Sequence, residues 1–207
     1  MASAAIGNMD HHVGMIGPNA ITRILEALNV VESPQSVRRI FKASGLEAYL
    51  FKQPTEMVDE REVMRLHRVL HQDLGGDRAR YIGRIAGGLT AEYLLRSRIP
   101  RPAQIALGYF PTSISSRLLA KAIAKNAWTF VGTGTFLVSH GRPIIFTIRK
   151  CPICREQRAT APYCDFYAAT FEHLYSRLVN ERARVTEVSC QAMGDEECKF
   201  RINWQEF

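Results

Sequence analysis

The spacing of apolar residues changes character near residue 126. Before this point, apolar side chains recur at the three- and four-residue intervals of amphipathic helices, and Pro and Gly separate the segments. The pattern predicts helices over residues 20–28, 34–44, 55–74, 78–96 and 113–126. The first half of the chain is therefore expected to be helical.

The second half is predicted to form two hairpins around one helix. Residues 128–139 and 143–149 are rich in β-branched and aromatic side chains on either side of a short turn. Residues 164–178 return to helical spacing, and residues 184–192 and 198–204 alternate as strands do. Because each hairpin needs a cover for its apolar face, we expect an α/β (α+β) fold. In it, helices cover an antiparallel sheet of two hairpins, next to a helical N-terminal part.

Composition is that of a folded protein, since 46% of the 207 residues are hydrophobic and 23% are charged. No apolar run approaches the ~20 residues that a membrane-spanning helix needs. The N-terminal segment lacks the basic start and continuous apolar run of a secretory signal. We therefore expect a cytoplasmic protein, and peripheral contact with the inner membrane stays open.

The net charge of +7 is concentrated in the middle of the chain. Residues 61–125 contain twelve Lys or Arg and only four acidic residues. This basic surface fits a solvated helical face as well as it fits an acidic partner, an anionic ligand or a membrane surface. Nucleic acid is not expected as a partner, because no zinc-finger spacing, RNA-binding aromatic motif or clear helix-turn-helix accompanies the charge.

Five cysteines gather in the last 57 residues, at Cys151, Cys154, Cys164, Cys190 and Cys198. The first two form a C-x2-C pair directly after a predicted strand, which lets two thiolates reach one ion. The third opens a predicted helix, whose N-terminal dipole stabilises a thiolate. In a reducing compartment, clustered cysteines are more often ligands or nucleophiles than disulfides.

The last two cysteines lie on the two arms of the second hairpin. Strand alternation places Cys190 on one face with Val188, and Cys198 on one face with Phe200 and Ile202; we expect both faces to point inward. Four converging thiolates suit tetrahedral zinc at about 2.3 Å per Zn–S bond, in a structural rather than a catalytic role. The alternatives are an iron–sulfur cluster on the same residues and buried cysteines without a ligand role.

Two motifs carry a family resemblance. The run from Pro162 to Tyr167, PYCDFY, and the E-x2-C-x3-G-x3-C-x-F ending from Glu187 to Phe200 resemble the vinyl-reductase domain, over about residues 85–204. The family includes sensor domains of aromatic-responsive transcription activators, archaeal stand-alone proteins and a bacteriochlorophyll-biosynthesis protein. With CPICR and YCDFYAATFEHL, the whole chain looks most like the last of these.

The resemblance implies a ligand-binding fold akin to nitric-oxide sensor domains, usually a homodimer. Residues 1–75 would be a helical N-terminal extension, and residues 76–207 the ligand-binding domain with its zinc site. In the sensor relatives, three cysteines that match Cys164, Cys190 and Cys198 hold zinc together with an upstream acidic residue. This chain has CPIC in that neighbourhood, so we expect Cys154 as the fourth ligand, with Cys151 as the alternative.

The resemblance also implies a function in bacteriochlorophyll biosynthesis. Reduction of a vinyl group needs a hydride or electron source, and the chain has no G-x-G-x-x-G between a strand and a helix. The preferred hypothesis is therefore a protein that binds a tetrapyrrole intermediate, divinyl protochlorophyllide or a precursor, and presents it to the pathway enzymes. The alternatives are a divinyl chlorophyllide vinyl reductase and a small-molecule sensor domain.

Candidate ligand-binding residues lie on the predicted helices over residues 55–74 and 78–96. Gly83 and Gly87 leave one helix face bare, which favours helix packing but would also accept a flat ring. Nearby arginines could pair with the carboxylates of a tetrapyrrole: Arg80 and Arg84, with Arg78, Arg96 and Arg98 as further candidates. His67 and His71 could ligate a central magnesium, although a pair at this spacing more often faces solvent.

Overall fold

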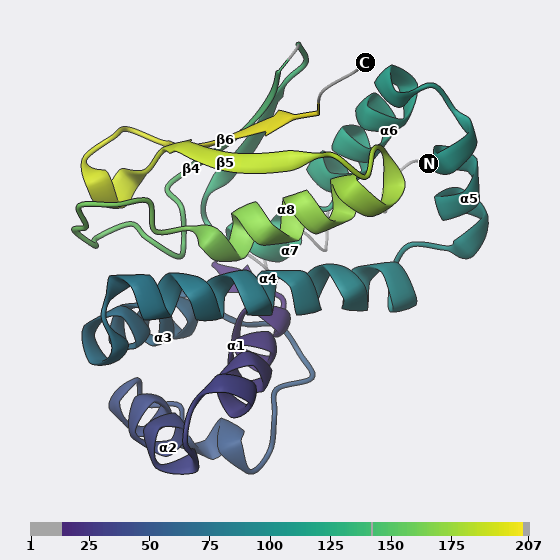
Figure 1. Cartoon of the computed structure of the whole chain (residues 1–207). Coiled ribbons are helices and arrows are strands. Elements are labelled where there is room, and N and C mark those ends of the chain that lie inside the picture. Colours follow the sequence, from purple (N-terminus) through teal and green to yellow (C-terminus); the bar gives the residue numbers. More distant parts are fainter. Residues whose placement is uncertain (1–13, 142, 205–207) are drawn as a thin grey trace, which may run out of the picture.

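The computed structural model describes residues 14–141 and 143–204 (Figure 1). The N-terminal segment considered above for a secretory signal lies largely outside this range. A helical layer packs below a layer that contains one long helix and the main sheet (Figure 1). The N-terminal half consists of α1 (Asn19–Val31), α2 (Pro34–Ala43), the short η2 (Glu47–Leu50), α3 (Glu60–Leu74) and α4 (Gly76–Ser97).

The main sheet is antiparallel throughout and has the order β3-β4-β6-β5. Its strands are β3 (Thr135–Ser139), β4 (Ile144–Arg149), β5 (Arg184–Ser189) and β6 (Cys198–Asn203). Helix α8 (Asp165–Leu178) lies against one face of the sheet and separates it from α4 (Figure 1). The expected fold class, an antiparallel sheet of two hairpins covered by helices, is confirmed.

The remaining elements connect these layers. Helices α5 (Arg101–Tyr109), α6 (Thr112–Lys125) and the single turn α7 (Trp128–Val131) lie between α4 and the sheet in the sequence. A small two-stranded sheet pairs β1 (Met15–Ile16) with β2 (Val58–Asp59), and η3 (Gln191–Met193) interrupts the second hairpin. None of the helices formed by residues 14–141 and 143–204 is both long and apolar enough to cross a membrane.

One continuous apolar core extends from α1 to β6. Between α8 and the sheet it is aromatic: Phe171 packs edge-on against Phe146 and Phe200, at ring centroid distances of 5.1 and 5.6 Å. Large rings in edge-to-face contact bury much apolar area and fix the register of helix against sheet. Because the core crosses residues 75 and 76 without a break, the division at that point stays a prediction.

Three element boundaries differ from the sequence prediction. Residues 128–131 form a helical turn, and β3 begins only at Thr135, because Gly132 reverses the chain with a φ of 56°. The helix predicted from residue 55 begins at Glu60, since Val58 and Asp59 pair with β1. Helix α5 was not predicted, because none of its residues is buried and its apolar pattern is short.

The inward face predicted for Val188 is wrong. A register shift between Glu187 and Ser189 breaks the alternation of β5, so Val188 is 46% exposed while Glu187 and Cys190 are buried. A bulge of this kind moves the following side chains to the opposite face. The alternation along β6 holds, since Cys198, Phe200 and Ile202 are all fully buried.

Candidate metal centre

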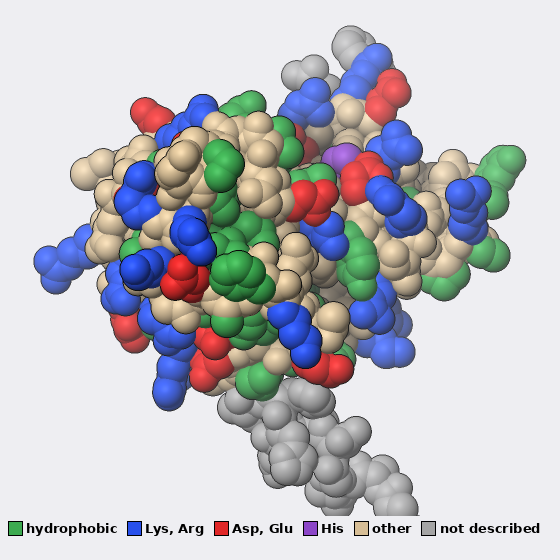
Figure 2. Space-filling view, turned by 90° about the horizontal axis from the view of Figure 1, so that it is seen from below, with side chains coloured by type: hydrophobic (Ala, Val, Ile, Leu, Met, Phe, Trp, Pro, Cys, Tyr) green, Lys and Arg blue, Asp and Glu red, His purple; other side chains and the backbone are tan. Residues whose placement is uncertain are grey.

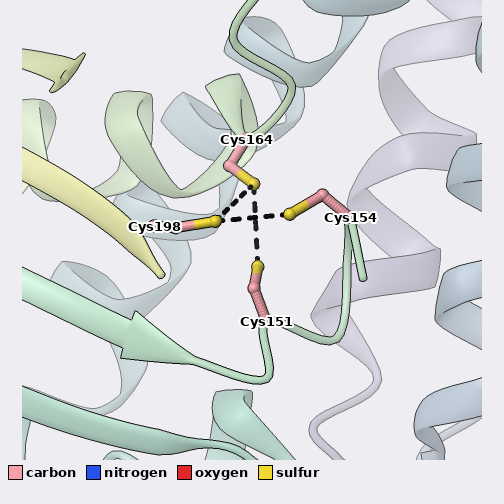
Figure 3. A group of neighbouring side chains, drawn as sticks. All are labelled: Cys151, Cys154, Cys164 and Cys198. Carbon is pink, nitrogen blue, oxygen red and sulfur yellow. Dashed lines mark hydrogen bonds between the residues drawn. The ribbon is translucent and has the colours of Figure 1, made fainter. Parts of the chain in front are cut away.

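All five cysteines are free, buried and gathered at one end of the sheet. Cys151 and Cys154 lie in the loop after β4, and Cys164 is the residue before the first turn of α8. Cys190 follows β5, and Cys198 is the first residue of β6. Side chains that are distant in sequence therefore meet in one volume between the sheet, α8 and a loop, and Figure 3 shows four of them pointing toward one another.

Four of the thiols form a compact group. The sulfur atoms of Cys151, Cys154, Cys164 and Cys198 all lie within 4.8 Å of one another (Figure 3). Individual Sγ–Sγ distances are 3.6 Å for Cys151–Cys164, 3.3 Å for Cys154–Cys198 and 3.9 Å for Cys164–Cys198. A tetrahedral site with Zn–S bonds of about 2.3 Å places its sulfur atoms ~3.8 Å apart. This group therefore has the size of a four-thiolate metal site.

A second group overlaps the first. Ligand atoms of Cys164, Glu187, Cys190 and Cys198 also lie within 4.8 Å of one another. Glu187 is only 8% exposed; one carboxylate oxygen accepts a 2.8 Å hydrogen bond from the Cys164 N–H, and the other has no partner among the described residues. Burial raises the pKa of Glu187 to about 10. A cation at this position would pair with the free oxygen and stabilise the carboxylate.

The chain between Cys190 and Cys198 is held by hydrogen bonds around the thiols. The Gln191 N–H donates to Cys198 Sγ at 3.4 Å, and the Gln191 side-chain oxygen accepts from the Cys151 N–H at 2.6 Å. The Cys190 N–H donates to an Asp195 carboxylate oxygen at 2.7 Å. Such bonds orient ligand side chains before an ion binds, so the centre is preorganised.

The predicted ligand set was Cys154, Cys164, Cys190 and Cys198, with Cys151 as the alternative to Cys154. The structure brings all five together but divides them differently: both residues of the C-x2-C pair lie with Cys164 and Cys198, and Cys190 lies with Glu187. Which of these atoms bind an ion stays a proposal. Glu187 was missed as a candidate, although it stands three residues before Cys190 in the family motif and the resemblance implied an acidic ligand in relatives.

The bare face of α4 is filled by α8. A Cβ at Gly87 would overlap the Phe166 carbonyl oxygen and lie 2.9 Å from the Cβ of Ala169. Thr170 of α8 also donates a 3.1 Å hydrogen bond to the Gly87 carbonyl, and Gly83 faces the Phe166 backbone. The helix-packing interpretation of the two glycines is therefore the one the structure follows, and no flat ligand fits between them and α8.

Arg80 and Arg84 already have protein partners. Arg80 pairs with Asp165 at 3.1 Å, and Arg84 pairs with Asp165 at 3.5 Å and with Glu172 at 3.2 Å. These ion pairs join α4 to α8 across the glycine contact. Both guanidinium groups remain partly exposed, but each would have to exchange a carboxylate of the protein for one of a ligand.

His67 and His71 do not face solvent as a pair. His67 is 2% exposed, its Nε2 has no hydrogen-bond partner among the described residues, and burial lowers its pKa to about 3. His71 stacks on Tyr163 with ring centroids 3.7 Å apart, and burial lowers its pKa to about 4. The expectation of a solvent-facing pair is wrong for His67, because α3 turns this side against Phe166 and the segment before α8.

Comparison with known proteins gives one domain match and two long sequence relatives. Residues 144–203 match the vinyl-reductase domain whose motifs were described above. The chain is 37% identical to the Bacteriochlorophyll synthase 23 kDa chain of Cereibacter sphaeroides, over 90% of this chain and 89% of that protein. It is 34% identical to the protein of the same name from Rhodobacter capsulatus, over 91% and 86%.

Solved structures support the fold. An Fe(II) unliganded H-NOX protein from K. algicida matches with a TM-score of 0.60 at 13% identity, covering 93% of this chain and 98% of that one. An H-NOX mutant from T. tengcongensis matches with a TM-score of 0.58 at 16% identity, covering 93% and 98%. At these identities the likeness shows the fold, which is the nitric-oxide-sensor-like fold expected. From its sequence relatives, the chain belongs to the family of the bacteriochlorophyll synthase 23 kDa chain, with a vinyl-reductase domain at its C-terminal end.

Proposed function

We propose that this protein acts in bacteriochlorophyll biosynthesis by binding a tetrapyrrole intermediate and presenting it to pathway enzymes, and that its metal centre holds zinc in a structural role. The names of the two relatives support the pathway. Two of the similar H-NOX structures are described in terms of heme or porphyrin distortion, which supports a tetrapyrrole as the ligand class. The cysteine donor set and its spacing support zinc.

One observation carries the ligand proposal: an apolar surface on α5 and α6 that the rest of the described chain leaves open. Helix α5 has no buried residue, and polar anchors such as the Gln104 bonds to the Leu95 and Ile99 carbonyls hold it in place. Five large apolar side chains are exposed and define the α5–α6 surface: Ile105, Tyr109, Phe110, Ile114 and Leu118. Exposed apolar groups of this size mark binding sites more often than plain surface.

Basic residues surround the α5–α6 surface. They are exposed and lie at the end of α4, the start of α5 and along α6: Arg98, Arg101, Arg117, Lys121 and Lys125. Apolar side chains lie beside basic ones at the edge of the molecule that carries α5 (Figure 2). A tetrapyrrole intermediate has a large flat apolar ring with carboxylate substituents, and this surface offers partners for both. It replaces the α4 face that α8 fills.

The reductase alternative rests on the cysteines. They are the residues on which an electron-carrying cluster could form, since the sequence has no dinucleotide-binding motif. Presentation without turnover needs no such group. The proposal therefore treats the metal centre as a brace for the second hairpin and assigns the ligand to the α5–α6 surface.

A titration separates these functions. Divinyl protochlorophyllide is added to the purified protein, with and without NADPH or reduced ferredoxin, while absorbance reports both binding and loss of the vinyl group. We expect binding without turnover. Reduction of the vinyl group would establish the reductase instead, and absence of binding would overturn both.

The position of the ligand is tested with matched aromatic variants. Tyr109→Glu removes an 86% exposed side chain from the α5–α6 surface, whereas Phe51→Glu removes a 77% exposed side chain from the N-terminal helical part. We expect Tyr109→Glu to weaken binding about tenfold, a loss of ~1.4 kcal/mol, and Phe51→Glu to leave binding unchanged. Equal effects of the two variants would mean that the ligand binds elsewhere.

The homodimer and peripheral membrane contact expected from the sequence belong to the same proposal. Light scattering of the purified protein measures its mass in solution. Co-sedimentation with anionic vesicles measures membrane contact, and the basic residues around α5 and α6 predict that such binding weakens as salt is added.

A further inference from the structure

The two candidate metal groups share two of their ligands. Cys164 and Cys198 belong to both, while the C-x2-C pair completes one group and Glu187 with Cys190 completes the other. Together they form a six-ligand cluster of Cys151, Cys154, Cys164, Glu187, Cys190 and Cys198. Two four-membered groups with two common members have the ligand count of two tetrahedral ions joined by two bridging atoms.

We infer that the six-ligand cluster binds two divalent metal ions, bridged by the thiolates of Cys164 and Cys198. The first ion is completed by Cys151 and Cys154, and the second by Glu187 and Cys190. A thiolate sulfur has more than one lone pair, so one sulfur can bind two ions at once. The inference concerns the metal centre alone and does not depend on tetrapyrrole binding.

Ligand use favours two ions over one. An ion in the first group alone leaves the second carboxylate oxygen of Glu187 buried without a partner among the described residues, and leaves Cys190 unused. An ion in the second group alone leaves Cys151 and Cys154 unused, although both are fully buried beside it. Buried polar groups without partners are costly, so the arrangement that employs all six is favoured.

Charge favours the same arrangement. Five thiolates and one carboxylate carry six negative charges when deprotonated. One divalent ion leaves four of these uncompensated in a buried volume, whereas two ions leave only two. The remaining charge meets the N-terminus of α8 at Cys164 and the Gln191 N–H at Cys198, the two bridging positions.

Metal content of the full chain tests the inference directly. The protein is loaded with zinc, separated from free metal, and its zinc-to-chain ratio is measured. We expect a ratio of two for the wild type and a ratio of one for each of two double variants, Cys151→Ser with Cys154→Ser and Glu187→Gln with Cys190→Ser. Glu197→Gln is the matched control on the same hairpin, because Glu197 pairs with Arg149 and Lys199 outside the cluster, and it should keep two.

Cadmium-113 NMR gives a second readout that does not depend on activity. The wild type should give two cadmium signals, and each double variant should lose a different one. A ratio of one ion and a single signal in the wild type would overturn the inference. Iron with acid-labile sulfide would overturn it as well, because an iron–sulfur cluster would then occupy the cysteines.

Folding of each variant is monitored by circular dichroism. If a double variant does not fold, the wild-type ratio and the number of wild-type cadmium signals still decide between one ion and two. If both variants fold but lose both ions, the two positions do not fill separately, and the inference of two distinct sites sharing a pair of bridges is contradicted.

Discussion

The carboxylate of Glu60, at the start of α3, accepts a 2.9 Å hydrogen bond from the backbone N–H of Thr133, in the loop before β3. The Thr133 hydroxyl donates to the same carboxylate at 2.8 Å, and Arg155, next to the C-x2-C pair, forms an ion pair with it. Gly132 is required beside it, because a Cβ there would overlap the carboxylate. One buried side chain thus connects the N-terminal helices to the loop of the metal centre.

Replacing Glu60 should destabilise the protein. Burial would raise the pKa of Glu60, but the hydrogen bonds from Thr133 and Arg155 outweigh burial and lower the pKa below its ordinary value. Glu60→Gln leaves the Arg155 charge without its partner, so we expect a loss of ~1–3 kcal/mol in denaturant unfolding. Glu26→Gln removes an exposed partner of Arg23 and should change stability by less than ~0.5 kcal/mol.

The effect of Glu60→Gln should depend on pH. Since folding lowers the pKa of Glu60, the stabilisation is present above the ordinary value of 4.5 and is lost as the pH falls through the lower folded-state value. The difference between wild type and variant should therefore be large at pH 7 and narrow below pH 4.5. A difference that stays constant down to about pH 3 would contradict this assignment.

His67 should make the protein sensitive to mild acid. Its pKa falls from 6.5 to about 3 on burial, so the unfolded chain binds a proton that the folded chain does not. Stability should decrease as the pH falls from about 6.5, and the decrease from this group ends only near the folded-state pKa. His67→Phe, which has no titratable group, should flatten the stability curve between about pH 6.5 and 4. Replacement of the histidine of a more exposed pair, His173→Phe, should not.

Two adjacent glycines of α4 should respond to alanine in opposite directions. A Cβ at Gly87 would overlap the backbone of α8, so Gly87→Ala should cost ~2–4 kcal/mol or prevent folding. A Cβ at Gly88 meets nothing within 4 Å, so Gly88→Ala should stabilise the helix by up to ~1 kcal/mol. Thermal unfolding of both variants tests whether α4 and α8 are in contact as described.

Metal removal should loosen the second hairpin. Cys190 and Cys198 flank the segment that contains η3, and both belong to the candidate metal groups. A chelator should lower the melting temperature of the wild type, and re-addition of zinc should restore it. Cys164→Ser, which removes a ligand common to both groups, should be less stable from the start and should respond little to the chelator.

The sequence by itself determined the kinds of element and the chemistry of the metal centre. Local spacing was enough for α1, α2 and α4 and for the strand β6, because these obey a single period and bury one regular face. The cysteine spacing was enough to predict convergence, since a C-x2-C pair, a helix start and two hairpin arms are local features. The family motif was enough to name the fold.

Only the tertiary structure decided which side chains meet. A bulge in β5 exposes Val188 and brings Glu187 into the cluster, and pairing with β1 delays the start of α3. The glycine face of α4 is bare in the sequence, and the packing of α8 against it excludes a flat ligand. These outcomes depend on contacts between residues far apart in the chain, which no local period encodes. The same contacts group Cys151 and Cys154 on one side of the shared thiolates and Glu187 and Cys190 on the other.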